Sequence, residues 1–156
     1  MGWLSRKIPF LRPRARSRSV LDDAQPGAEW IAAALQKAGY RADFSVTSFR
    51  ELDRFFDAEA PGGRARPGGL LSRNVGHHLF CLGAYCGEVV RRQIGGTWSV
   101  DEGDPQAEIH VALVLPDGTH IWPVQRVMKR FRDGPSEGLH AYGTAILQEV
   151  GKRGGG

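Results

Sequence analysis

The residues with the greatest potential for chemistry are a histidine, a cysteine and a glutamate that recur at helical spacing. They are His77, Cys81 and Glu88. In an α-helix, residues four or seven positions apart lie on the same side. His77 could therefore act as a base for the Cys81 thiol, with nearby arginines lowering the thiol pKa. This spacing raises the hypothesis of a thiol-dependent enzyme.

The same three side chains raise the alternative of a metal-dependent enzyme, because histidine, cysteine and glutamate all bind zinc. The chain carries no second Cys/His pair at ligand spacing, and His78 points about 100° away from His77 in a helix. No nucleophile elbow or phosphate-binding loop accompanies the segment. We therefore predict no metal site and no cofactor, and we expect a protein without catalytic activity.

A helix must position these residues, and the surrounding pattern predicts one over residues 70–94. The residues expected on its core-facing side are Val75, Leu79, Leu82, Cys86 and Val89. An adjacent strip holds Gly76, Gly83 and Gly87. Glycine costs a helix about 0.5–1 kcal/mol relative to alanine. We therefore expect a neighbouring element to pack closely against this strip.

Basic residues form two groups that could contact an anion. Arg91 and Arg92 follow Glu88 at the spacing of intrahelical ion pairs. A second helix, predicted over residues 124–132, carries further basic residues on its outer face. The candidates for anion contact are Arg91, Arg92, Arg126, Lys129 and Arg130. Outside the first 20 residues acidic residues slightly outnumber basic ones, which argues against nucleic-acid binding by the domain.

The two ends of the chain have the composition of disordered segments. Residues 1–20 hold six Lys and Arg residues and no acid, together with Trp3 and Phe10. We predict a disordered basic tail over residues 1–24 and a second disordered tail over residues 151–156. The basic tail could contact an anionic membrane surface or nucleic acid. The chain has no apolar run long enough for a transmembrane segment.

Residues 25–150 are expected to form a single α+β domain. After residue 96 the apolar pattern changes from helical to alternating, and the LPDGT sequence at residues 115–119 predicts a hairpin turn. We predict a three-stranded antiparallel meander packed with about five helices. The expected helices lie near 26–39, 48–60, 70–94, 124–132 and 137–150, and the expected strands at 98–100, 109–115 and 120–122.

The run GAYCGEVVRRQIGGTW, followed by LPDGTHIWPVQRVMKRFRDG, resembles a family of small bacterial proteins of unknown function, including actinobacterial ones. They share a GxYxGExxRRxxGGxW helix end. The resemblance covers residues 70–148 and implies a common fold and a bacterial, cytoplasmic setting. It implies no activity, and Cys81 and Cys86 lie outside the shared pattern. We therefore expect a cytoplasmic binding or interaction module with a protein partner.

Overall fold

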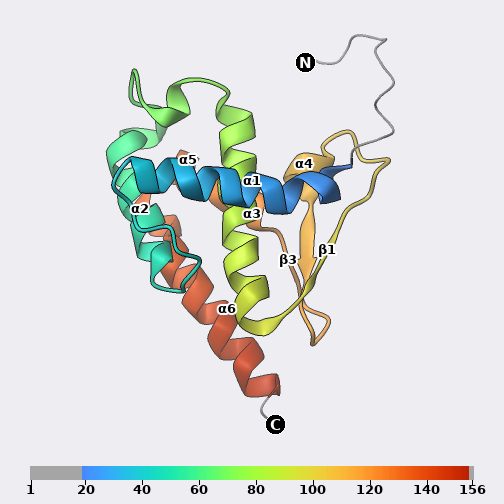
Figure 1. Ribbon diagram of the computed structural model, residues 1–156. Coiled ribbons are helices and arrows are strands. Elements are labelled where there is room, and N and C mark those ends of the chain that lie inside the picture. Colours follow the sequence, from blue (N-terminus) through green and yellow to red (C-terminus); the bar gives the residue numbers. More distant parts are fainter. Residues whose placement is uncertain (1–18, 155–156) are drawn as a thin grey trace.

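The computed structural model describes residues 19–154, in which six α-helices pack together with a small antiparallel sheet on one side (Figure 1). This arrangement confirms the predicted α+β fold with a three-stranded antiparallel sheet. The helices are α1 (Val20–Lys37), α2 (Ser48–Glu59), α3 (Val75–Ile94), α4 (Ala107–His110), α5 (Pro123–Asp133) and α6 (Leu139–Gly154). The strands are β1 (Thr97–Ser99), β2 (Ala112–Val114) and β3 (His120–Ile121). Three single 3-10 turns, Pro61–Gly63, Leu70–Ser72 and Pro135–Glu137, connect them.

Helix α1 begins earlier than the sequence predicted. The Ser19 hydroxyl accepts a hydrogen bond from the backbone N–H of Leu21, and the Asp22 carboxylate accepts one from the backbone N–H of Ser19. This capping box starts the helix at Val20. The predicted start near Pro26 and the tail boundary at residue 24 were therefore wrong. Residues 1–18, to which the prediction of membrane or nucleic-acid contact belongs, lie outside the described residues.

Helix α3 runs through the middle of the molecule and is crossed by α1 (Figure 1). It starts at Val75, after a separate 3-10 turn, and not at residue 70 as predicted. Every residue from 78 to 90 is buried, so α3 has no exposed polar side along this stretch. The side expected to carry Cys81 and Glu88 is covered as well, because α1, α5 and α6 all contact α3.

Two of the three glycines on α3 make the close contacts that the sequence predicted. A Cβ atom on Gly83 would lie 2.5 Å from the Cα atom of Val124, at the start of α5. A Cβ atom on Gly87 would overlap the indole ring of Trp98 in β1. Gly76 faces open space, with no atom within 4 Å of such a Cβ. The first two glycines therefore allow α5 and the sheet to approach α3.

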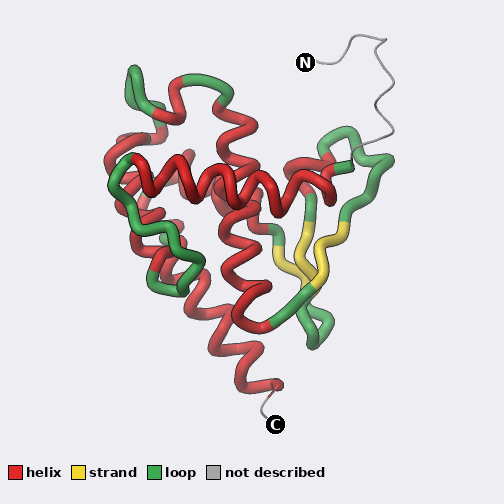
Figure 2. The backbone as a smooth tube through the Cα atoms, viewed as in Figure 1, coloured by secondary structure: helices red, strands yellow, loops and turns green. Residues whose placement is uncertain are grey.

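The three strands form a meander on one side of α3 (Figure 2). Leu113 at its centre pairs with Trp98 on one side and with Ile121 on the other. The predicted hairpin turn is present, with Gly118 at φ 89° and a hydrogen bond from Leu115 N–H to the Thr119 carbonyl. The strand predicted over 109–115 is present but shorter, because β2 covers only Ala112–Val114 and residues 107–110 form the short helix α4.

Helix α6 continues to Gly154, so the predicted disorder of residues 151–156 was wrong for residues 151–154. An aspartate from α2 holds its first turn. The Asp53 carboxylate accepts hydrogen bonds from the backbone N–H groups of Leu139 (2.9 Å) and His140 (3.0 Å). Among the described residues no helix is both long and apolar enough to cross a membrane.

Candidate functional site

The structure does not bring the three predicted catalytic candidates together around an open pocket. His77 is exposed near the start of α3, whereas Cys81 and Glu88 are fully buried. The Cys81 Sγ atom lies 3.6 Å from His77 Nε2, so these two residues do meet as their spacing predicted. However, α1 covers the thiol, since a Cβ atom on Gly27 would lie 3.3 Å from Cys81 Sγ. Cys81 is therefore closed off from any substrate.

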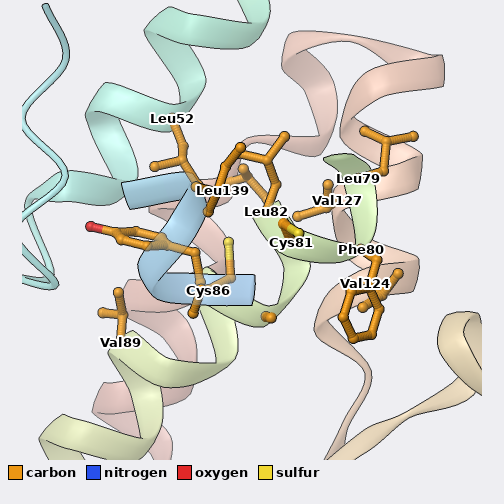
Figure 3. Packing of buried hydrophobic residues seen from close by; sticks show 14 of the residues in the cluster. Leu52, Leu79, Phe80, Cys81, Leu82, Cys86, Val89, Val124, Val127 and Leu139 are labelled. Carbon is orange, nitrogen blue, oxygen red and sulfur yellow. The ribbon is translucent and has the colours of Figure 1, made fainter. Parts of the chain in front are cut away.

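The chemistry of Cys81 follows from this burial. Figure 3 places the Cys81 side chain of α3 among the buried hydrophobic residues of the core. Burial, with smaller contributions from the charges of Asp23 and Glu108, raises the pKa of the Cys81 thiol to about 11. A nucleophilic cysteine requires the opposite shift, toward the thiolate. Within residues 19–154 there is also no cluster of three or more His, Cys, Asp or Glu side chains that could hold a metal ion.

Glu88 is buried, and its carboxylate forms hydrogen bonds with side chains of neighbouring elements. Its carboxylate accepts hydrogen bonds from Arg91 at 2.7 and 2.9 Å, from the indole N–H of Trp98 at 2.9 Å and from Gln25 at 3.3 Å. Arg92 Nε lies 3.5 Å from the carboxylate, which confirms both predicted intrahelical ion pairs. Burial alone would raise the pKa of Glu88, but these hydrogen bonds together hold it below its ordinary value. Glu88 therefore joins α1, α3 and β1.

The five predicted anion-contact residues do not form one surface. At the end of α3, Arg91 forms an ion pair with Glu88 and Arg92 forms one with Glu29. The Arg92 guanidinium also lies 3.6 Å from the centroid of the Phe44 ring. Arg130 was predicted to face outward but is only 2% exposed. It donates hydrogen bonds to the carboxylates of Asp53 and Asp57. Of the five, only Arg126 and Lys129 line a common groove.

This groove, which we call the Trp122 groove, lies between β3, α5 and α6 and has a volume of about 230 Å³. Its lining consists of aromatic, basic and amide side chains around one isoleucine. These residues are His120, Ile121, Trp122, Gln125, Arg126, Lys129 and Tyr142. Trp122 is 45% exposed, which is unusual for so large an apolar side chain. It is one of the few large hydrophobic residues that the fold leaves open to solvent.

The groove is partly preorganised by contacts among its own side chains. The rings of His120 and Trp122 lie 6.2 Å apart between centroids. The Arg126 guanidinium lies 4.6 Å above the ring of Tyr142, and its Nη1 is 2.6 Å from a carboxylate oxygen of Glu137. Burial raises the pKa of the Tyr142 hydroxyl above its usual range. This tyrosine therefore stays neutral and offers a flat aromatic surface.

A second groove begins on the other side of Ile121. It lies between the β2–β3 hairpin and α6, has a volume of about 260 Å³, and is lined almost entirely by apolar atoms. We call it the α6 groove. Its lining residues are Leu115, Thr119, Ile121, Ala145, Ile146, Glu149 and Val150.

Comparisons with known proteins give no match for this chain, neither to a protein-family model, nor to a curated protein, nor to a solved structure. The resemblance to small bacterial proteins remains a prediction.

His120, Trp122 and Tyr142 were not predicted as site residues from the sequence. One signal was available, because His120 and Trp122 are two positions apart and flank the buried Ile121. Such alternation places both rings on the outer face of a strand. Tyr142 had no comparable signal, since it reaches the groove from a different helix. The lining combines aromatic rings with two cationic side chains, which suits contact with an aromatic or negatively charged group.

Proposed function

We propose that this protein is a non-enzymatic interaction module of the bacterial cytoplasm that binds a protein partner at the Trp122 groove. The observation that carries the proposal is the exposure of Trp122 in a groove with Arg126, Lys129 and Tyr142. Tryptophan, tyrosine and arginine are the residue types most enriched at the energetic centres of protein interfaces. The bacterial, cytoplasmic setting rests on the sequence resemblance alone.

The size of the groove favours a protein partner over a small molecule. Sites that enclose a small ligand usually have volumes of about 300–1,000 Å³. The Trp122 groove, at about 230 Å³, is smaller and open, and it lies beside the second groove. Such a surface is suited to side chains that a larger molecule inserts from outside.

Trp30 offers a matched control for this proposal. It is 49% exposed on α1, and its ring stacks on His78 with 5.4 Å between centroids. It lines neither groove. Replacement of Trp30 therefore removes an exposed indole of similar size from a different surface.

The test is a quantitative pull-down from a bacterial lysate, with the full chain, the Trp122→Ala variant or the Trp30→Ala variant immobilised. We expect Trp122→Ala to weaken capture of a specific protein about thirtyfold, the effect of a hot-spot residue. The Trp30→Ala variant should retain it. Equal capture of the same proteins by all three chains would contradict the proposal, as would turnover of a small substrate by the purified protein.

A further inference from the structure

We infer that the partner segment is a linear stretch of protein in which carboxylate side chains lie next to apolar ones. It occupies the Trp122 groove and the α6 groove together. This inference rests on the proposed function and specifies the chemistry of the partner. It follows from the wall that the two grooves share at Ile121, from the position of β3 at the edge of the sheet and from the position of the positive charge.

The two grooves share both of their walls. Ile121 of β3 lines both of them. On α6, Tyr142 lines the Trp122 groove, and Ala145 and Ile146 line the α6 groove at positions three and four residues later. Residues at this spacing lie on one face of a helix. One face of α6 and one strand therefore bound a single path, which a continuous segment of chain can follow.

The side of β3 that faces away from β2 is not covered by another strand. The strand order is β1-β2-β3, so among the described residues β3 is an edge strand. Next to it the α6 groove presents almost only apolar atoms. Covering apolar surface removes it from water and favours association. This part of the path therefore suits aliphatic or aromatic side chains of a partner.

The positive charge is confined to the α5 end of the path. Lys129 is exposed, and the acidic group that its charge acts on, Asp133, is itself paired with Arg132 at 2.9 Å. Arg126 adds a charge that Glu137 partly neutralises. Glu149 lines the opposite end. A complementary segment therefore places its carboxylates at the α5 end and its apolar side chains toward α6.

The same charges disfavour other occupants. Residues 1–18 of this chain carry six basic residues and no acid, so their charge has the same sign as that of Lys129. A nucleic acid needs several phosphate contacts. The path offers one exposed lysine and one partly neutralised arginine. An acidic protein segment fits this arrangement better than either.

The test starts with a phage display of random 12-residue peptides on the purified full chain. We expect the selected peptides to contain Asp or Glu next to Leu, Ile or Phe. A synthetic selected peptide should then bind about tenfold more weakly to Lys129→Glu. A second version of this peptide, with its carboxylates replaced by lysines, should recover binding to Lys129→Glu. The matched control is Lys37→Glu, an exposed lysine of α1 that lines neither groove.

A second variant tests the apolar end of the path. Ala145 is exposed and lines the α6 groove, so Ala145→Glu should weaken binding of the same peptide about tenfold without altering the core. The matched control is Ala33→Glu, another exposed alanine in a helix, which lines neither groove.

Selected peptides without carboxylates would overturn the inference, and so would peptides that bind Lys129→Glu and Ala145→Glu as tightly as the parent chain. If no peptide is selected while a lysate protein is captured in a Trp122-dependent manner, a linear segment is excluded and the proposed function stands. If neither peptides nor lysate proteins depend on Trp122, both proposals fail.

Discussion

A buried carboxylate is costly unless hydrogen bonds and opposite charge replace its water. Glu88 meets this condition through Arg91, Trp98 and Gln25, which come from three different elements. The same contacts explain why Glu88 is not reactive, because Arg91, Trp98 and Gln25 all donate to its charged form. At the scale of single residues, Glu88 therefore stabilises the fold and does not take part in a site.

This role predicts a pH-dependent loss of stability in Glu88→Gln. The folded-state pKa of Glu88 lies below its ordinary value of 4.5. Its stabilising contribution is therefore fully present above pH 4.5 and is lost as the pH falls through the folded pKa. We expect Glu88→Gln to lower the free energy of unfolding by about 2 kcal/mol at pH 7, the value of hydrogen bonds to a charged group. The difference from the parent chain should shrink steadily below pH 4.5.

Urea unfolding followed by tryptophan fluorescence at several pH values measures this difference. Glu29→Gln is a suitable control, because Glu29 is largely exposed and its carboxylate lies 3.4 Å from Arg92. Exposed ion pairs contribute about 0–1 kcal/mol. A loss in Glu88→Gln that is the same at pH 3.5 and pH 7 would show that the charge of Glu88 does not stabilise the fold.

At the scale of elements, local signals predicted those features that depend on local physics. The Pro-Asp-Gly turn formed as expected, because proline and glycine favour the dihedral angles of a turn wherever they occur. The start of α1 was misjudged, since Pro26 lies inside a helix that is capped upstream by Ser19. The segment 109–115 alternates as a strand does, yet residues 109 and 110 belong to the short helix α4. There Asp104 accepts hydrogen bonds from Gln106 N–H and from the His110 ring.

The candidate site was harder to predict because it depends on which elements pack together. Cys81 was expected on the same side of α3 as His77 and Glu88, but Gly27 allows α1 to lie directly over it. Trp122 and Tyr142 are 20 residues apart in the sequence and meet only because α6 packs beside β3. No spacing rule connects such positions, so the groove could not be predicted from the sequence.

The close approach of α5 to α3 predicts opposite effects for two glycine substitutions in the same helix. A Cβ atom on Gly83 would lie 2.5 Å from the Val124 backbone. We expect Gly83→Ala to destabilise the protein by about 1–3 kcal/mol, the usual cost of overpacking. Gly76 has open space around it. Gly76→Ala should therefore stabilise the protein by up to about 1 kcal/mol through helix propensity.

Thermal unfolding followed by circular dichroism compares the two variants directly. Gly76→Ala is the matched control, because it makes the same chemical change in the same helix. An increase in stability for both variants would mean that α5 can shift away from α3 without cost, and the proposed role of Gly83 would be wrong.

At the scale of the whole molecule, a polar cluster connects helices that are distant in the sequence. The Arg130 side chain from α5 donates hydrogen bonds to the Asp53 carboxylate (2.9 Å), the Asp53 carbonyl (3.0 Å) and the Asp57 carboxylate (2.7 Å). Asp53 also accepts from the first backbone N–H groups of α6. A single carboxylate of α2 thus caps one helix and neutralises a buried cation on another.

Removal of this carboxylate should therefore weaken the fold as a whole and not only the start of α6. We expect Asp53→Ala to lower the free energy of unfolding by about 3 kcal/mol, from the lost helix cap and the lost charged hydrogen bond together. Asp53→Asn should lose less, because it keeps one acceptor oxygen. The control Asp133→Ala removes an exposed ion pair with Arg132 and should cost no more than about 1 kcal/mol.

Hydrogen exchange measured by mass spectrometry decides between global and local effects. We expect faster exchange in α2, α5 and α6 together. Faster exchange in the first turn of α6 alone would show that Asp53 stabilises only the start of that helix.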